Sequence, residues 1–173
     1  MDDPKLTRTA FDTIIAQAER DFPDETCGFI IGPASVREGA SVGAQEVRPI
    51  TNIQNARHAA DPQRFARDAR TAFLMDPKEH LAVLNEIDRR KLSLIAVYHS
   101  HPEHDAYFSA TDRAQACLFD PAEPDYPDAF HIVLSVRGGR FARAAAFLWD
   151  PAIKDFAERE LEVIDSEAAI GSL

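Results

Sequence analysis

The chain has 173 residues, 45% of them hydrophobic, and a formal net charge of −10 at pH 7. This length and apolar content predict a single domain with a packed core over residues 1–173. The acidic balance disfavours nucleic-acid binding, which needs clustered Lys and Arg, and no apolar run approaches the roughly 18 residues of a membrane span.

The first third of the chain predicts a helix followed by two paired strands. Hydrophobic residues recur at helical spacing over roughly 7–21, which indicates an amphipathic helix. The apolar run CGFIIG at 27–32 is typical of a buried strand. Residues 33–44 are rich in Gly, Ser and Ala and predict a loop, and residues 45–53 predict a partner strand. Pro49 places that partner strand at a sheet edge or a bulge.

The middle of the chain predicts two helices and a central strand. Residues 61–73, DPQRFARDARTAF, suggest a short helix. The clearer helix spans 76–91, because Asp76 can cap it and Pro77 suits its first position. The segment 92–99 is nearly all apolar, which indicates a central strand buried on both faces.

The last third predicts one more helix and a run of strands. Residues 109–119 begin the helix, and the strands 130–136 and 140–149 flank an RGG turn typical of an antiparallel pair. Residues 156–164 are interpreted as a strand rather than a helix. This order of elements predicts an α/β domain with a mixed central sheet and helices on its faces.

Two features of the sequence indicate the cellular compartment of the protein. The first residues, MDDPKLTRTAFD, are acidic and lack an apolar core, so we expect no secretory signal. Cys27 and Cys117 are too few for a disulfide framework, and we interpret both as reduced thiols. Both features predict a cytoplasmic protein.

The stretch YHSHPEHDAYFSATD, residues 98–112, gathers the candidate site residues. Side chains two apart in an extended segment point the same way, so His99 and His101 project together from the end of the central strand. Ligands commonly bind at such strand ends. Two imidazoles suit zinc, and a catalytic zinc takes three protein ligands and leaves one position for water. Asp112, in the first turn of the next helix, can supply the third ligand.

Structural interpretations compete with this one. A bare His-x-His is weak evidence for a metal, and Ser109 with Asp112 also fits a capping box. Both can hold together, with Ser109 capping the helix while Asp112 turns an oxygen to a metal. Cys27, close to Glu25, is more typical of a small core residue than of a nucleophile.

The remaining residues near the motif are expected to be structural or solvent-exposed. Ser100 should point away from the two histidines, and His104 should be solvated. Tyr107 and Phe108 fit a substrate groove and loop packing equally well. The other histidines have no partners in the sequence and should be structural or exposed: His58, His80 and His131.

The complete string resembles the signature of the JAMM (MPN-plus) zinc metallopeptidases: His99-x-His101-Pro102, six residues, then Ser109-x-x-Asp112. FPDETCGFIIG, at 22–32, resembles the family's N-terminal element. MDPKEHL followed by LIAVYHSHP is similar to prokaryotic members, including those that process sulfur-carrier proteins. The resemblance covers roughly residues 8–150. It implies an MPN (JAMM)-like domain with a mixed, mostly antiparallel central sheet flanked by helices.

The resemblance also implies roles for individual residues. His99, His101 and Asp112 match the zinc ligands, Glu25 matches the general base acting on the zinc-bound water, and Ser109 matches the residue that hydrogen-bonds the oxyanion. The implied enzyme is a zinc peptidase or isopeptidase that cleaves an amide at the C-terminal tail of a ubiquitin-like or sulfur-carrier protein. Without the resemblance, Glu25 fits a loop or helix-end carboxylate better.

Two other functions stay open. The chain could be a non-catalytic MPN scaffold, or a JAMM peptidase acting on a phage-tail or peptidoglycan-linked peptide. The Pro-rich residues 119–129 look long for a compact prokaryotic relative, and their effect on substrate access is open. We expect no nucleic-acid or membrane partner, and the sequence does not indicate an oligomeric state.

Overall fold

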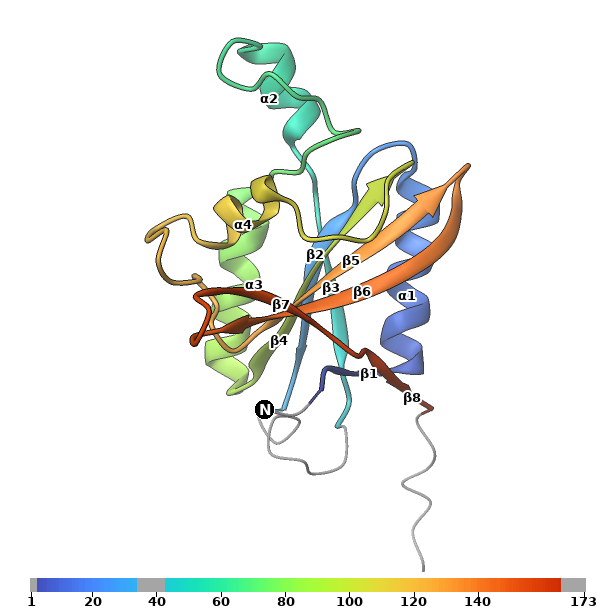
Figure 1. Ribbon diagram of the computed structural model, residues 1–173, viewed down its shortest axis with the longest axis vertical. Helices are drawn as coiled ribbons and strands as arrows, with labels where there is room; N and C mark the ends of the chain where they lie inside the picture. Colours follow the sequence, from blue (N-terminus) through green and yellow to red (C-terminus); the bar gives the residue numbers. More distant parts are fainter. Residues whose placement is uncertain (1–2, 34–42, 166–173) are drawn as a thin grey trace, which may run out of the picture.

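The computed structural model describes residues 3–33 and 43–165. Its main element is a six-stranded sheet with a long helix on each face, and two shorter helices lie near one end (Figure 1). A separate pair of short parallel strands, β1 and β8, lies near the start of α1. The elements are β1 Lys5–Thr7, α1 Arg8–Asp21, β2 Cys27–Gly32, β3 Glu46–Ile50, α2 Gln54–Ala60, α3 Pro77–Arg90, β4 Ser93–Pro102, α4 Ala110–Ala116, β5 Phe130–Arg137, β6 Arg140–Asp150, β7 Asp155–Arg159 and β8 Glu162–Ile164.

The main sheet has the strand order β3-β2-β4-β5-β6-β7. The neighbours β4 and β5 are parallel, and the other four neighbouring pairs are antiparallel. A parallel pair needs a crossover connection, and α4 lies in the connection from β4 to β5. The predicted mixed, mostly antiparallel sheet flanked by helices is confirmed.

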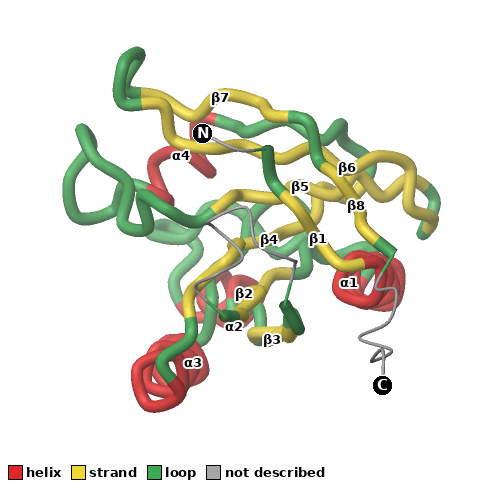
Figure 2. Tube along the Cα trace, turned by 90° about the horizontal axis from the view of Figure 1, so that it is seen from below, coloured by secondary structure: helices red, strands yellow, loops and turns green. Residues whose placement is uncertain are grey.

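Two hydrophobic clusters cover opposite faces of the sheet. Figure 2 shows α1 on one side of the strands and α3 on the other. Alternation along β4 sends Tyr98 into the cluster under α1 and Val97 into the cluster under α3. Cys27, which pairs with His99, also belongs to the α3 cluster. His99 and His101 therefore continue the α3 face of β4 toward the end where that strand stops.

Helix α3 begins and ends where the sequence predicts. The Asp76 carboxylate accepts hydrogen bonds from the backbone N–H groups of Lys78 and Glu79, at 2.8 and 3.1 Å, and Pro77 occupies the first turn. The helix ends at Lys91, which adopts the left-handed conformation at the C-cap.

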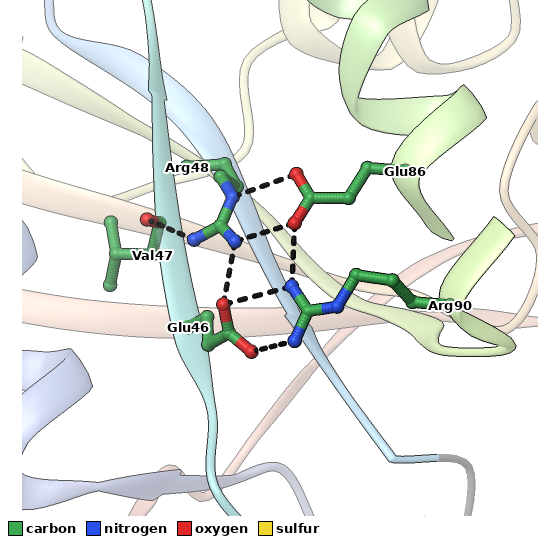
Figure 3. A network of polar contacts seen from close by, with 5 residues as sticks. All are labelled: Glu46, Val47, Arg48, Glu86 and Arg90. Carbon is green, nitrogen blue, oxygen red and sulfur yellow. Dashed lines mark hydrogen bonds and ion pairs between the residues drawn. The ribbon is translucent and has the colours of Figure 1, made fainter. Parts of the chain in front are cut away.

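A network of four charged side chains joins α3 to the edge strand β3. Figure 3 shows Glu46 and Arg48 of β3 facing Glu86 and Arg90 of α3, with each guanidinium bonded to both carboxylates. The hydrogen bond from Arg90 lowers the pKa of Glu46 to about 2, and the one from Arg48 lowers the pKa of Glu86 to about 2. Both carboxylates therefore stay ionised at neutral and mildly acidic pH.

The predicted helix over 61–73 is wrong. Helix α2 lies earlier, at Gln54–Ala60, and residues 61–73 form turns. Polar side chains take the backbone groups that a helix would pair with one another. The Gln54 side-chain amide donates to the backbone carbonyl of Arg67 at 2.7 Å, and the side-chain Oδ1 of Asn55 accepts from the backbone N–H of Ala69 at 2.8 Å.

Other boundaries differ less. The predicted strand 156–164 is confirmed as extended but divides into β7 and β8, and the helix predicted over 109–119 is the shorter α4. Strand β3 lies at the sheet edge, as Pro49 predicts. Most of the predicted loop 33–44 lies outside the described residues. Within residues 3–33 and 43–165, no helix combines the length and apolar character that crossing a membrane requires.

Candidate metal centre and active site

Strand β4 and helix α4 bring the three predicted ligands together. His99 and His101 lie near the end of β4, and Asp112 lies in the first turn of α4. The three side chains form a buried group in which one candidate ligand atom from each residue lies within 4.8 Å of the other two. In the described part of the chain, this is the cluster whose composition and spacing suit a metal ion.

The distances within the cluster match those between ligands of one small cation. The two Nε2 atoms of His99 and His101 are 3.1 Å apart, and they lie 3.3 and 3.4 Å from the two carboxylate oxygens of Asp112. Donors about 2.0–2.1 Å from a tetrahedral zinc are separated by roughly 3.3 Å. The geometry therefore fits zinc.

The hydrogen bond of His101 supports the same conclusion. Its Nδ1 lies 2.9 Å from the backbone carbonyl oxygen of Asp105, which can only accept, so Nδ1 carries the proton. In the neutral ring, Nε2 then presents a lone pair to the cluster. Metal-binding histidines typically make such a bond through the other ring nitrogen.

Burial and charge act strongly on these three residues. His99, His101 and Asp112 are only 1%, 5% and 7% exposed. Burial lowers the pKa of His99, which favours the neutral ring that binds metals. Burial alone would lower the pKa of His101, but its hydrogen bonds to Asp112 and to the Asp105 carbonyl raise it above the ordinary value. Burial alone would raise the pKa of Asp112, but hydrogen bonds and the charges of its neighbours hold it well below its usual range.

The pairing of β2 with β4 brings Glu25 to the cluster. Cys27 pairs with His99, and Ser100 donates its N–H to the Thr26 carbonyl at 3.0 Å. Continuing this antiparallel register places Glu25 beside His101. The backbone N–H of Glu25 donates to the carbonyl of Ala69 at 2.7 Å, which fixes it against the segment after α2.

The Glu25 carboxylate is in an unusual state for an acidic residue. It is 6% exposed, and no side chain or backbone group of the described residues donates a hydrogen bond to it. Burial raises the pKa of Glu25 to about 8. A cation at the cluster would lower it, because opposite charge favours the ionised carboxylate.

Glu25, His101, Ser109 and Asp112 line one cavity of about 390 Å³. Tyr107, which is largely exposed, forms part of its wall. The other residues lining it are Arg67, Thr71, Ala72, Phe73, His104, Thr111 and Gln115. The cavity therefore gives access to two of the three predicted ligands, His101 and Asp112, and to the predicted base Glu25 together.

Ser109 caps α4, as the capping-box interpretation predicts. Its hydroxyl oxygen accepts the N–H of Asp112 at 3.1 Å, and its own N–H donates to the Asp112 carboxylate at 2.8 Å. The hydroxyl also donates to the same carboxylate at 2.6 Å. To donate to an oxyanion, this hydroxyl must turn away from Asp112.

The neighbouring residues divide into lining and packing roles. Tyr107 lines the cavity, whereas Phe108 packs against a cluster that includes His131 and Phe147. The Ser100 hydroxyl accepts the N–H of Thr26 at 2.8 Å, away from the two histidines. His104 is exposed at the cavity wall.

Cys27 and the remaining histidines have the structural roles expected of them. Cys27 is buried in the α3 cluster, and burial raises the pKa of its thiol, which disfavours a nucleophilic role. His80 bonds the Tyr126 hydroxyl at 2.7 Å, and His58 lies 2.6 Å from the Phe65 carbonyl oxygen.

The sequence did not predict that the segment after α2, which includes Phe73, lies against the cluster. Phe73 stacks on the His99 ring, with centroids 4.7 Å apart and an interplanar angle of 27°. Asn52 holds this segment, since its side chain donates to the Glu25 carbonyl at 2.9 Å and accepts from the N–H of Leu74 at 3.0 Å. A detectable signal was the polar run Asn52-x-Gln54-Asn55, which favours side-chain bonds to the backbone over a second helix.

Residues 7–146 match the model of the family described as prokaryotic homologs of the JAB domain. The chain belongs to this family. The match covers most of the chain and includes all five predicted site residues, so the predicted JAMM/MPN resemblance is confirmed.

This JAB-family chain resembles proteins with named activities. It is 32% identical over 115 residues to a desampylase of Haloferax volcanii, covering 64% of this chain and 70% of the relative. It is 29% identical over 124 residues to a CysO-cysteine peptidase of Mycobacterium tuberculosis, covering 72% and 67%. These relatives and the family support a hydrolase of the peptidase class, which disfavours the scaffold alternative.

Solved structures support the same fold. A Desulfitobacterium hafniense protein superposes with a TM-score of 0.66 at 23% identity, covering 94% of this chain and 93% of that one. A Salinibacter ruber protein superposes with a TM-score of 0.58 at 23% identity, covering 98% and 96%. At this identity, the likeness concerns the fold alone.

Replacing Ser109 by alanine separates its capping role from a role in chemistry. Loss of the cap should destabilise the protein by about 1 kcal/mol. If the hydroxyl also turns to the oxyanion, kcat should fall by up to about 10²–10³-fold. We expect both losses, measured by thermal melts and cleavage rates at equal zinc occupancy. A less stable but fully active variant would restrict Ser109 to capping.

Proposed function

We propose that this chain is a zinc-dependent peptidase or isopeptidase that cleaves an amide at the C-terminal tail of a ubiquitin-like or sulfur-carrier protein. The observation that carries the proposal is a cavity lined by Glu25 together with His101 and Asp112, two members of the His99–His101–Asp112 cluster. Support for the substrate class comes from the relatives' names. They include a probable TtuB-protein conjugate cleaving protease of Thermus thermophilus, 46% identical over 46 residues that span 27% of this chain and 31% of that one.

His99, His101 and Asp112 would hold the zinc ion. When bound, zinc lowers the pKa of a coordinated water to about 7 and polarises a carbonyl oxygen. Asp112 brings one negative charge, and the two neutral imidazoles bring none, so the site would keep a net positive charge that favours a developing oxyanion.

Glu25 would move the proton. Its carboxylate faces the cavity without a hydrogen-bond donor from the described residues, so it is available to a water molecule. As general base, it takes a proton from the attacking water, and it then gives a proton to the nitrogen of the leaving amine. The broken bond is the amide C–N bond, and the products are a carboxylate and an amine. Burial of Glu25 limits exchange of this proton with bulk solvent.

The shape of the site suits a narrow, flexible tail. His101 and Asp112 line the cavity yet are only 5% and 7% exposed, so the scissile amide must approach closely. Glycine residues beside that amide would allow this, because they carry no side chain to meet the wall. A Gly-Gly tail, such as ubiquitin-like proteins carry, therefore fits better than a chain of bulky residues.

The test is cleavage of a ubiquitin-like fusion in which a Gly-Gly tail precedes a short reporter peptide. Zinc-loaded protein should release the reporter at the Gly-Gly junction, chelation should abolish release, and added zinc should restore it. A second fusion with Val-Val at the junction should be cut far more slowly. Equal cleavage of both fusions would exclude the proposed tail specificity, and cleavage that survives chelation would exclude the zinc mechanism.

A further inference from the structure

We propose that Ser135 and Arg137 are positioning residues for His101, acting through the loop that follows β4. We call residues 103–106 the ligand loop. Both side chains lie at the end of β5, which runs parallel to β4 and pairs with it as far as Pro102. The inference rests on the proposed function in one respect: it takes His101 as a metal ligand.

Every backbone carbonyl of the ligand loop accepts a hydrogen bond from a side chain. The four consecutive carbonyl oxygens each accept a hydrogen bond from a different side chain, and three of the four donors come from β5 and β6. The pairs are Glu103 with Arg137 at 3.2 Å, His104 with Ser135 at 2.6 Å, Asp105 with His101 at 2.9 Å, and Ala106 with Arg143 at 3.3 Å.

Regular pairing with β5 ends at the first residue of this loop, where the Glu103 N–H donates to the Val136 carbonyl at 2.8 Å. Glu103 has φ +62°, a left-handed conformation that disfavours continuation of β4. Residues 103–105 are exposed, so water could bind their carbonyls if the side chains were absent. The Arg137 guanidinium reaches the Asp105 carboxylate at 2.5 Å as well as the Glu103 carbonyl. Arg137 therefore bonds to the residue before His104 and to the residue after it.

Ser135 fastens the middle of the same loop. It is 2% exposed, and its hydroxyl donates to the His104 carbonyl, the group directly before Asp105 in the chain. The Asp105 carbonyl oxygen accepts a hydrogen bond from the Nδ1–H of His101 and another from the N–H of Tyr107 at 3.1 Å. The position of this one carbonyl therefore sets both the tautomer and the orientation of the His101 ring.

Removing the hydrogen bonds from Ser135 and Arg137 to the ligand loop should weaken metal binding without changing a ligand. If the Asp105 carbonyl moves, His101 loses the acceptor that keeps its proton on Nδ1, and the Nε2 lone pair is no longer constantly aimed at the cluster. Loss of such an outer partner typically costs about 10–100-fold in metal affinity. A residue that only stabilised the fold would lower the melting temperature and leave the zinc affinity of the folded protein unchanged.

The experiment measures the zinc dissociation constant by competition with a chromophoric chelator. The variants are Ser135→Ala, Arg137→Met and the double variant, and the matched control is Arg140→Met. Arg140 faces Arg137 across the same hairpin, is exposed, and makes no hydrogen bond to the ligand loop within the described chain. We expect the double variant to bind zinc about tenfold to 100-fold more weakly. Arg140→Met should remain within about twofold of the parent, since it removes an equal charge and no loop contact.

A second measurement keeps the inference independent of zinc. Nitrogen NMR shifts of the His101 ring, recorded on metal-free protein at alkaline pH, report which ring nitrogen carries the proton. The parent and Arg140→Met should show the Nδ1–H form, and the double variant a mixture. Arg137→Met removes an exposed side chain, so it should fold even if the double variant does not.

These outcomes separate the inference from the proposed function. Parent-like zinc affinity and tautomer in the folded variants would overturn the positioning role while leaving the metal centre intact. A parent that binds no zinc would contradict the proposed function, and the tautomer would then decide the inference: a shift in Arg137→Met supports it, and none overturns it.

Discussion

Glu25→Gln is expected to retain the fold and the bound zinc and to lose most of the catalytic rate. Glutamine has nearly the same shape, but it cannot take a proton from water, and general acid–base catalysis contributes about 10²–10⁴-fold. The carboxylate accepts no hydrogen bond from the described residues, so the substitution breaks no contact that holds the structure. The measurement is kcat on the Gly-Gly fusion, together with zinc content and a thermal melt.

Glu160→Gln is the matched control for this result. Glu160 is exposed in the turn between β7 and β8, and its substitution makes the same chemical change away from the cavity. It should leave kcat unchanged. A Glu25→Gln variant that cleaves as fast as Glu160→Gln would remove Glu25 from the mechanism.

His99→Ala is expected to abolish zinc retention and, with it, activity. Two remaining ligands, His101 and Asp112, do not complete the three-ligand set of a catalytic zinc. His99 is buried and stacked on Phe73, so its removal also leaves a cavity, and the melting temperature should fall. Elemental analysis of the purified variant measures the zinc directly, on the folded fraction.

His104→Ala tests whether the loss is specific to the cluster. His104 lies five residues farther along and lines the cavity beside His101 and Asp112, yet it is exposed and not among the clustered residues. This variant should keep about one zinc per chain, because it leaves the three-ligand set His99, His101 and Asp112 intact. Full zinc occupancy in His99→Ala would show that other residues bind the metal.

Short-range spacing in the chain was enough to predict much of the architecture and which side chains of the candidate cluster share a face, whereas the ligand set itself was predicted from the family resemblance. The caps of α3, the hairpin of β5 and β6, and the strands β2 and β4 follow from local periodicity and turn residues. His99 and His101 share a face because strand side chains alternate, and Ser109 with Asp112 follows from the capping of a helix start. Each of these depends on residues within a few positions of one another.

The position of Glu25 beside the cluster depends on long-range pairing. It is more than seventy residues from His101 in the sequence, and it reaches the cluster because β2 pairs with β4 in a register that sets Cys27 against His99. A shift of one residue would turn the Glu25 side chain to the opposite face of the sheet. The motif resemblance pointed to Glu25, but no local pattern did.

The segment after α2 and the ligand loop were beyond prediction for a related reason. Both are irregular, and their backbone groups bond to side chains from distant elements, such as Asn52 for one and Ser135 for the other. Periodicity reports how a segment satisfies its own hydrogen bonds, and it carries no information about partners supplied from elsewhere. The alternation that puts His99 and His101 on one face can therefore be predicted from spacing, whereas the side chains that contact the segment after α2 and the ligand loop become visible only when the chain is folded.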